Sequence, residues 1–189
     1  MRVKKFRSNV AAVIIHPTEN KVLMFRRLAE KDKNSGFLTG GGQLKWNWQF
    51  PQGGVNDGES EEEALFRELK EEIGTGDVKI IRVGEKRIRY HYPLKVKRVL
   101  DQQSQWRPFR GQQQRWFLLH LNCQTDKISF NHHPIEFDAF QWISPRKGLR
   151  MVVPFKRKAY RKGLRMLGVL KFAGISAEKQ ILKIPLNYN

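Results

Sequence analysis

Cysteine is almost missing from this sequence of 189 residues, since Cys123 is the only one. An internal disulfide is therefore impossible, which excludes disulfide-stabilised secreted domains and is typical of a reducing compartment. Long apolar runs are missing too, because the run over residues 10–15 is far shorter than the roughly 20 residues of a membrane span. We therefore expect a cytoplasmic protein without a membrane-spanning segment.

Acidic residues are scarce, with 18 Asp and Glu against 36 Lys and Arg, so the formal net charge is +18 at pH 7. Such an excess does not define a fold, but it favours negatively charged partners. Nucleic acid or another polyanion comes first and an anionic membrane surface second. A soluble protein that is basic without such a partner is the alternative.

Apolar and β-branched runs indicate strands along most of the chain. The predicted strands cover residues 9–16, 21–27, 78–83, 86–92, 113–122 and 137–143. We expect the first two of them to pair with each other across the turn that joins them. Polar or glycine-rich stretches predict loops over residues 29–45, 52–58 and 95–111.

The clearest helix is predicted over residues 60–73. Ser60 can cap its N-terminus, with Glu63 completing a capping box. Apolar residues at four-residue spacing form one buried face. Gly74 is a typical helix stop.

A basic amphipathic helix is predicted over residues 154–172, with Tyr160 facing inward and basic residues, Lys156 among them, facing water or a ligand. The order of strands and helices indicates an α/β protein with a mixed sheet between helices. We expect one domain over residues 1–172 and a C-terminal tail over residues 173–189.

Three glutamates gather near the end of the first predicted helix, in the stretch RELKEEIG. Glu68, Glu71 and Glu72 would share one helical face, where like charges repel unless a cation lies among them. Carboxylate oxygens are the ligands that Mg²⁺ and Mn²⁺ prefer, so this face is a candidate metal site. The alternative is a solvated acidic face paired with Arg67 and Lys70.

These glutamates belong to a longer pattern, G-x5-E-x7-R-E-L-x-E-E-x-G, which runs from Gly53 to Gly74. The pattern resembles the Nudix box, the signature of the Nudix hydrolase superfamily. It departs only at the final aliphatic position, where Thr75 stands. The resemblance implies a Nudix-type α/β/α sandwich with a mixed central sheet. It also implies hydrolysis of phosphoric anhydride bonds with Mg²⁺, for which Mn²⁺ can substitute.

Further segments resemble the bacterial RNA 5′-pyrophosphohydrolases and occur in the same order. They are the pair Arg26-Arg27, WQFPQGG, GQQQRWFLLHL, IEFDAFQW and VVPFKRKAY. Members of that family remove pyrophosphate from the 5′-triphosphate end of RNA and leave a 5′-monophosphate, which starts mRNA decay. Plant and bacterial dinucleoside polyphosphate hydrolases share much of this sequence, notably WQFPQGG.

Carried over to the matching positions, the resemblance implies a set of site residues. The expected metal ligands are the backbone carbonyl of Gly53 and the side chains of Glu68, Glu71, Glu72 and Glu136. The residues expected to serve catalysis are Arg67, Glu68, Glu72 and Glu136. The residues expected to contact RNA are Arg7, Arg27, Val153, Phe155 and Lys156.

The first hypothesis is therefore a metal-dependent RNA pyrophosphohydrolase whose partner is 5′-triphosphorylated RNA, with no membrane partner and an unknown protein activator. The net positive charge favours this polyanionic substrate. The second hypothesis is a hydrolase of diadenosine polyphosphates or nucleoside triphosphates. The third is a catalytically inactive RNA-binding Nudix module, which the complete set of glutamates disfavours.

Overall fold

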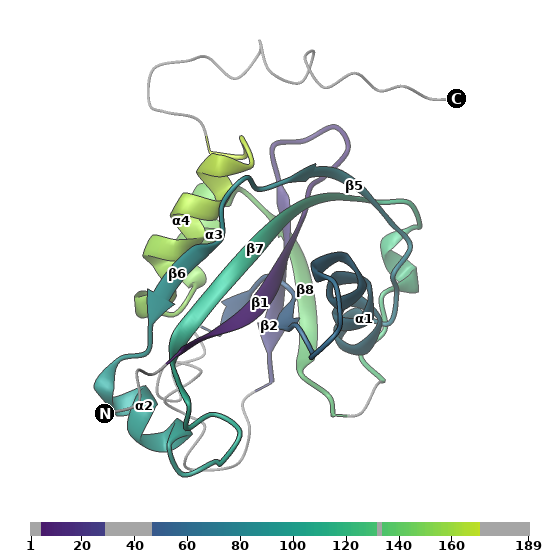
Figure 1. Ribbon diagram of the computed structural model, residues 1–189. Coiled ribbons are helices and arrows are strands. Elements are labelled where there is room, and N and C mark those ends of the chain that lie inside the picture. Colours follow the sequence, from purple (N-terminus) through teal and green to yellow (C-terminus); the bar gives the residue numbers. More distant parts are fainter. Residues whose placement is uncertain (1–4, 29–46, 132–133, 171–189) are drawn as a thin grey trace.

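The computed structural model describes residues 5–28, 47–131 and 134–170. In Figure 1 the strands lie in the middle of the molecule, with helices on either side. The loop predicted over residues 29–45 and the predicted C-terminal tail lie outside the described residues.

The strands form two sheets. The larger one contains β1 (Lys5–Ile14), β4 (Gln52–Gly54), β5 (Val78–Val83), β6 (Ile88–His91) and β7 (Phe109–Leu121). Its order is β4-β1-β7-β5, and β6 also pairs with β7. The β1–β7 pair is parallel and the other pairs are antiparallel, so this sheet is mixed. The smaller, antiparallel sheet has the order β3-β2-β8 and contains β2 (Val22–Arg27), β3 (Trp48–Gln49) and β8 (Phe137–Ile143).

The predicted pairing of the first two strands is wrong. Where the structure describes them, β1 and β2 share only an isolated bridge between Ile15 and Val22, and they enter different sheets. Both edges of β1 are already occupied, because β4 lies on one side of it and β7 on the other. The predicted loop over residues 52–58 is also partly wrong, since its first residues form β4.

Helix α1 (Glu61–Ile73) begins and ends as predicted. The Ser60 hydroxyl accepts a hydrogen bond from the Glu63 backbone N–H at 3.2 Å, and the Glu63 carboxylate accepts one from the Ser60 N–H at 2.8 Å. Gly74 adopts a left-handed conformation with φ 77° and donates its N–H to the Lys70 carbonyl. The capping box is therefore confirmed, and it sets where the glutamate-bearing helix starts.

The basic helix predicted over residues 154–172 is shorter than expected. It starts as the 3-10 helix η4 (Pro154–Lys156), continues as α4 (Arg157–Met166), and is followed by Gly168 at φ 80°. A residue with positive φ cannot continue a right-handed helix, so this glycine ends the element.

Short helices were missed by the sequence analysis. Helix α2 (Leu94–Leu100) lies at the start of the loop predicted over residues 95–111, and α3 (Pro145–Met151) follows β8. A third, the 3-10 helix η3 (Thr125–Lys127), is a single turn. Such short helices have no room for the repeated apolar spacing that reveals a longer one.

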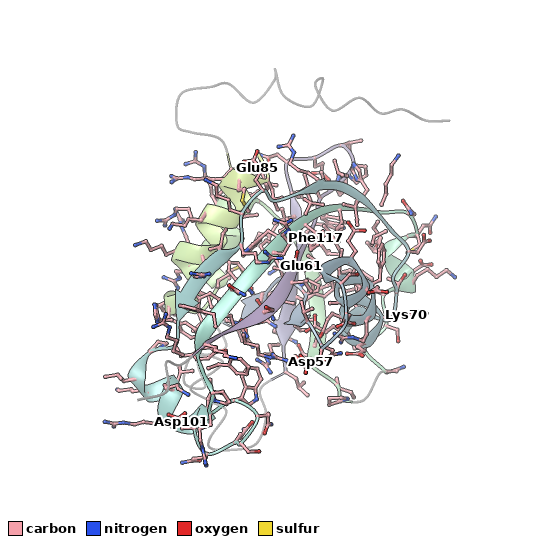
Figure 2. The ribbon with its side chains drawn as sticks, in the orientation of Figure 1. Asp57, Glu61, Lys70, Glu85, Asp101 and Phe117 are labelled. Carbon is pink, nitrogen blue, oxygen red and sulfur yellow. The ribbon has the colours of Figure 1, made fainter. Side chains whose placement is uncertain are left out.

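Side chains of the strands alternate between two cores, one on each face of the sheets. Val10 and Ile14 of β1 pack in the core beneath α1, whereas Ala11 and Val13 pack in the core that includes residues of α3 and α4. Phe117 of β7, which is 1% exposed, points into the interior of the molecule (Figure 2). The period-two alternation of a strand therefore places helices on both faces.

The α/β class and the sandwich of a mixed sheet between helices are confirmed. In the part of the chain that the structure describes, no helix is both long and apolar enough to cross a membrane.

Candidate functional site

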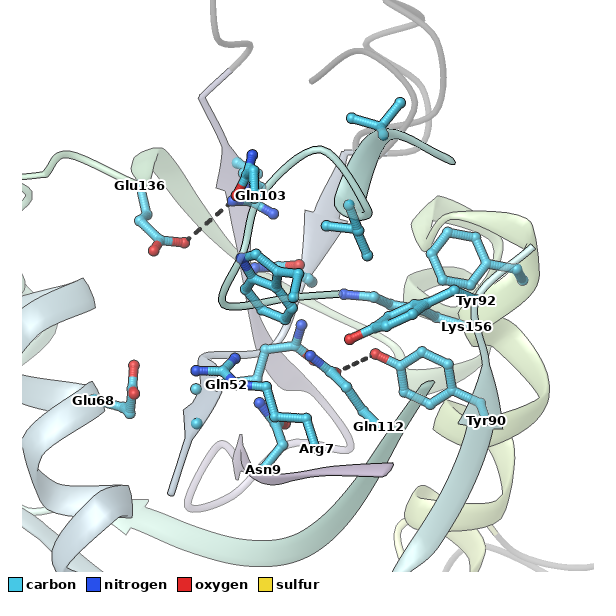
Figure 3. Close-up of a pocket in the computed structure, with 18 of the residues that line it drawn as sticks. Arg7, Asn9, Gln52, Glu68, Tyr90, Tyr92, Gln103, Gln112, Glu136 and Lys156 are labelled. Carbon is cyan, nitrogen blue, oxygen red and sulfur yellow. Dashed lines mark hydrogen bonds and ion pairs between the residues drawn. The ribbon is translucent and has the colours of Figure 1, made fainter. Parts of the chain in front are cut away.

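A pocket of about 430 Å³ gathers most of the residues that the sequence predicts for the site. Those that line it are Arg7, Arg27, Gly53, Glu68, Glu71, Glu136, Phe155 and Lys156. In Figure 3, Glu68 and Glu136 lie at one side of the pocket, and Tyr90, Tyr92 and Lys156 lie at the other. We call these the carboxylate side and the aromatic side.

Arg67 organises the carboxylate side from behind the pocket wall. Its Nε and one terminal nitrogen donate to the two oxygens of Glu59, at 2.7 and 2.9 Å. Its other terminal nitrogen donates to Glu68 at 2.8 Å and to Glu71 at 3.2 Å. The Gly54 carbonyl accepts a further bond at 2.8 Å. One guanidinium therefore connects the glycine turn to α1, and its geometry can hold several carboxylates at once.

The glycine turn lies so close to α1 that a side chain has no room. A Cβ built on Gly53 would lie 1.6 Å from the carboxyl carbon of Glu68. Gly53 also pairs with Val10 in the sheet, which keeps its backbone in place. Because Gly53 has no side chain, the Glu68 carboxylate can lie against its backbone. The carbonyl of Gly53 is the one that the sequence predicts to bind metal.

Glu72 is buried beneath the pocket, with 5% of its surface exposed. Its carboxylate accepts a hydrogen bond from the Gln52 N–H at 2.9 Å. Burial raises the pKa of Glu72 well above its usual range, and the charges of Glu136 and Glu68 raise it further, while the Gln52 bond and Arg27 oppose the shift.

Glu136 reaches the pocket because β2 and β8 are held together at their ends. Arg26 donates to both oxygens of Asp138, at 2.7 and 3.1 Å. The Leu28 N–H donates to the Glu136 carbonyl at 2.8 Å, and Arg27 approaches the Glu136 carboxylate at 3.6 Å. Residues far apart in sequence are thereby brought to the same side of the pocket as α1.

The carboxylate side has the donors that a hard divalent cation prefers. Within the described ranges, no three His, Cys, Asp or Glu side chains are already arranged around one point to hold a metal ion. Arg67 holds Glu68 and Glu71 instead. Burial is the main cause that raises the pKa of Glu68, and the charges of Glu71 and Glu136 add to it. The residues fit such an ion in chemistry, and binding it would require the carboxylates to turn toward it.

The aromatic side brings together rings from β6, from Tyr92 just after it and from η4. The Tyr90 ring lies 6.1 Å from that of Phe155 and 6.3 Å from that of Tyr92. Burial raises the pKa of Tyr90 well above its usual value, so its hydroxyl keeps its proton and donates to Gln112. Aromatic faces of this kind are suited to stacking on nucleobases.

Lys156, which the sequence predicts to face water or a ligand and to contact RNA, is only 9% exposed and lines the pocket. Burial lowers its pKa to about 7, the charge of Arg27 lowers it further, and Glu72 and Glu136 oppose the shift. Val153, predicted to contact RNA, is 8% exposed and packs in the core rather than along the pocket.

Several pocket residues were missed by the sequence analysis. They are Asn9, Gln49, Gln52, Tyr90, Tyr92, Val99, Leu100, Gln103, Trp106 and Gln112. Most lie on strands read as structural or in the segment over residues 95–111 read as a loop. The one available signal was the aromatic residues of that segment and of β6, because large aromatic side chains flanked by polar residues often face a ligand.

Comparisons with known proteins show what this chain is similar to. The family model described as NUDIX domain matches residues 5–163. An RNA pyrophosphohydrolase of Helicobacter pylori is 39% identical over 162 residues, which cover 84% of this chain and 91% of that protein. An RNA pyrophosphohydrolase of Vibrio cholerae is 44% identical over 135 residues, covering 66% and 76%. The fold also resembles the structure of the E. coli dihydroneopterin triphosphate pyrophosphohydrolase, with a TM-score of 0.56 over 83% of this chain and 95% of that one. The two sequences are 19% identical, so this likeness concerns the fold alone.

Proposed function

The chain belongs to the NUDIX domain family, and we propose that it removes pyrophosphate from the 5′-triphosphate end of RNA and so promotes mRNA decay. It is a Nudix hydrolase, an enzyme that acts on phosphoric anhydride bonds. The observation that carries the proposal is the pocket itself, which joins a carboxylate side to an aromatic and basic side. We propose that the enzyme works in the cytoplasm, in keeping with its single cysteine.

Hydrolases of this family generally need a divalent metal ion, and we propose Mg²⁺, with Mn²⁺ able to substitute. The residues that would hold it are the Gly53 carbonyl and the carboxylates of Glu68, Glu71, Glu72 and Glu136. When bound, the ion neutralises phosphate oxygens and activates water.

The chain's own groups position the reaction. Arg67 keeps Glu68 and Glu71 at the pocket wall and ties both to Glu59. One oxygen of Glu68 is engaged by Arg67, which leaves the other to accept the proton of the attacking water. The water oxygen bonds to phosphorus, the anhydride P–O bond breaks, and pyrophosphate leaves. Positioning and charge stabilisation supply most of the rate in such reactions.

The aromatic side would hold the nucleotides at the 5′ end. Arg7, Arg27 and Lys156 bring positive charge to the pocket for phosphates, and Phe155 offers a ring to a base. Val153 packs in the core against which Phe155 rests, so its role in this proposal is to support that ring.

A direct comparison of substrates tests the proposal. Short RNA with a 5′-triphosphate and diadenosine tetraphosphate are supplied separately at matched concentration, with Mg²⁺ and then with Mn²⁺. A higher kcat/KM on RNA supports the proposed function. A preference for the dinucleotide makes the enzyme a dinucleoside polyphosphate hydrolase. No turnover of either substrate with either metal would favour the inactive RNA-binding module.

A further inference from the structure

The connection between α2 and β7 forms part of the pocket that the proposed function leaves without a role. Its residues Gln103 and Trp106 line the pocket. The backbone reaches them through successive turns, with the Gln103 N–H donating to the Leu100 carbonyl at 3.0 Å and the Trp106 N–H to the Gln103 carbonyl at 3.1 Å. The Phe109 N–H then donates to the Trp106 carbonyl at 3.0 Å as β7 begins. Trp106 thus lies inside a hydrogen-bonded run of turns.

Side-chain and backbone contacts anchor the same connection at both ends. The Lys97 ammonium donates to the Asp101 carboxylate and, at 3.1 Å, to the Arg107 carbonyl. The Lys5 N–H donates to the Pro108 carbonyl at 3.1 Å. These bonds restrict where the backbone of Trp106 can move, and a restricted aromatic ring loses little conformational entropy when a ligand stacks on it.

Arg7 connects this tryptophan to the carboxylate side. Its guanidinium lies 4.4 Å from the centre of the half-buried Trp106 ring. One terminal nitrogen lies against the glycine turn, since a Cβ built on Gly54 would come within 2.1 Å of it. The Arg7 guanidinium makes no hydrogen bond or ion pair with any other residue that the structure describes. Its donors are therefore available to an anion in the pocket.

A phosphate bound by Arg7 would lie beside the indole ring, between the glycine turn and the α2–β7 connection. The nucleoside attached to that phosphate would then lie near Trp106, which lines the same pocket. Tryptophan presents a large aromatic face, and stacking on it tolerates all four bases because each has a π face.

We propose that Trp106 is a substrate-binding residue that stacks on the base of one of the first two nucleotides of the RNA. This inference rests on the proposed function and deepens it, because it assigns the α2–β7 connection to recognition of a nucleobase rather than of phosphate alone. Trp106 and Arg7 form one unit, in which the arginine holds a phosphate and the tryptophan receives the neighbouring base.

Steady-state kinetics on matched RNAs test the proposal. Trp106→Ala, Trp106→Phe and the control Gln102→Ala, an exposed residue of the same connection that does not line the pocket, are compared with wild type. The substrates are a 5′-triphosphorylated RNA and the same RNA with an abasic first or second nucleotide. We expect Trp106→Ala to raise KM on the intact RNA about 10-fold with little change in kcat. For Trp106→Phe, which keeps a ring, KM on the intact RNA should stay within about 3-fold of the wild-type value. For Gln102→Ala it should equal the wild-type value.

The abasic RNAs separate stacking from support of Arg7. If Trp106 stacks on a base, wild type and Trp106→Ala should have the same KM on one of the two abasic RNAs. An equal loss on intact and both abasic RNAs would mean that Trp106 only positions Arg7, and this would overturn the proposal. So would an unchanged KM on intact RNA. If Trp106→Ala does not fold, as judged by its thermal transition, Trp106→Leu takes its place as the variant without a ring. It is then compared with Trp106→Phe, which keeps one.

Failure of the proposed function is visible separately, in the wild-type reaction alone. If wild type does not hydrolyse the intact triphosphorylated RNA, the proposed function is wrong and this inference falls with it.

Discussion

The two sides of the pocket are built differently. The carboxylate side takes most of its residues from one continuous stretch, the glycine turn and helix α1, and a single arginine joins them through bonds of 2.7–3.2 Å. The aromatic side takes Tyr90 from β6 and Phe155 and Lys156 from η4, and Trp106 of the connection that follows α2 also lines the pocket.

This difference in construction matches a difference in the expected task. Charged groups that act on a phosphorus atom need controlled positions, and Arg67 ties Glu59, Glu68 and Glu71 of one continuous motif to one another. Groups that hold flexible nucleotides need faces and charges spread over a larger area, which several elements supply together. Changes on the carboxylate side should therefore lower kcat on every substrate, whereas changes on the aromatic side should raise KM on RNA.

Glu72→Gln should have the largest effect. It removes a negative charge from the expected metal site but keeps an oxygen to accept the Gln52 N–H. We expect kcat to fall by about 100-fold or more on RNA and on diadenosine tetraphosphate alike, with a thermal midpoint in metal-free buffer no lower than that of wild type. Initial rates over a range of Mg²⁺ and calorimetry measure both. Near-normal kcat would show that Glu72 is not needed by the carboxylate side.

Arg67→Lys should come next. An ammonium retains the charge but cannot bond Glu59, Glu68 and the Gly54 carbonyl in one plane, as the guanidinium does. We expect kcat to fall about 10- to 100-fold on both substrates, as for other residues that orient metal ligands. Single-turnover rates at saturating substrate test this. A selective loss on RNA alone would contradict the division between the two sides.

Lys156→Met should affect RNA selectively. The side chain is buried, so an apolar chain of similar length fills the same space while the positive charge is lost. We expect KM on triphosphorylated RNA to rise about 10-fold and the slope of log KM against log salt to fall by about 1. Diadenosine tetraphosphate serves as the comparison substrate, and Lys158→Met, on the exposed face of α4, is the matched control. Equal losses on both substrates would argue against a role in holding RNA.

Ser60→Ala should have the smallest effect on activity. It removes the acceptor for the Glu63 N–H at the start of α1, at a residue that does not line the pocket. We expect a loss of about 1 kcal/mol in the free energy of unfolding, with kcat and KM within about twofold of wild type. Chemical denaturation and the standard assay measure both. A large loss of kcat would mean that the frayed first turn no longer holds Arg67 and its glutamates.

Much of the carboxylate side could be predicted because its information is local. Helical spacing places Glu68, Glu71 and Glu72 within two turns, and the capping box fixes where the helix begins. The aromatic side could not be predicted in the same way. Trp106 lies in a segment whose polar composition indicates a loop. It contacts Arg7, a residue of β1 that is far from it in sequence.

The wrong predictions share a cause. The expectation that the first two strands pair treated neighbours in sequence as neighbours in space, but β4 and β7 occupy both edges of β1. The expectation that residues 52–58 form a loop treated glycine content as a guide to conformation, but residues 52–54 pair with β1 as β4. In both cases long-range pairing overrode a local preference.

The sequence by itself determined which carboxylates share one helical face, because helix α1 and the glycine turn before it depend on spacing that one short segment contains. It also determined the alternating strands and the start and end of α1. Only the tertiary structure decided which side chains face those carboxylates across the pocket. Those residues come from elements that are distant in sequence. They meet because β1 pairs with β7 and because η4 and the α2–β7 connection pack beside the pocket, and no local sequence pattern predicts these long-range contacts.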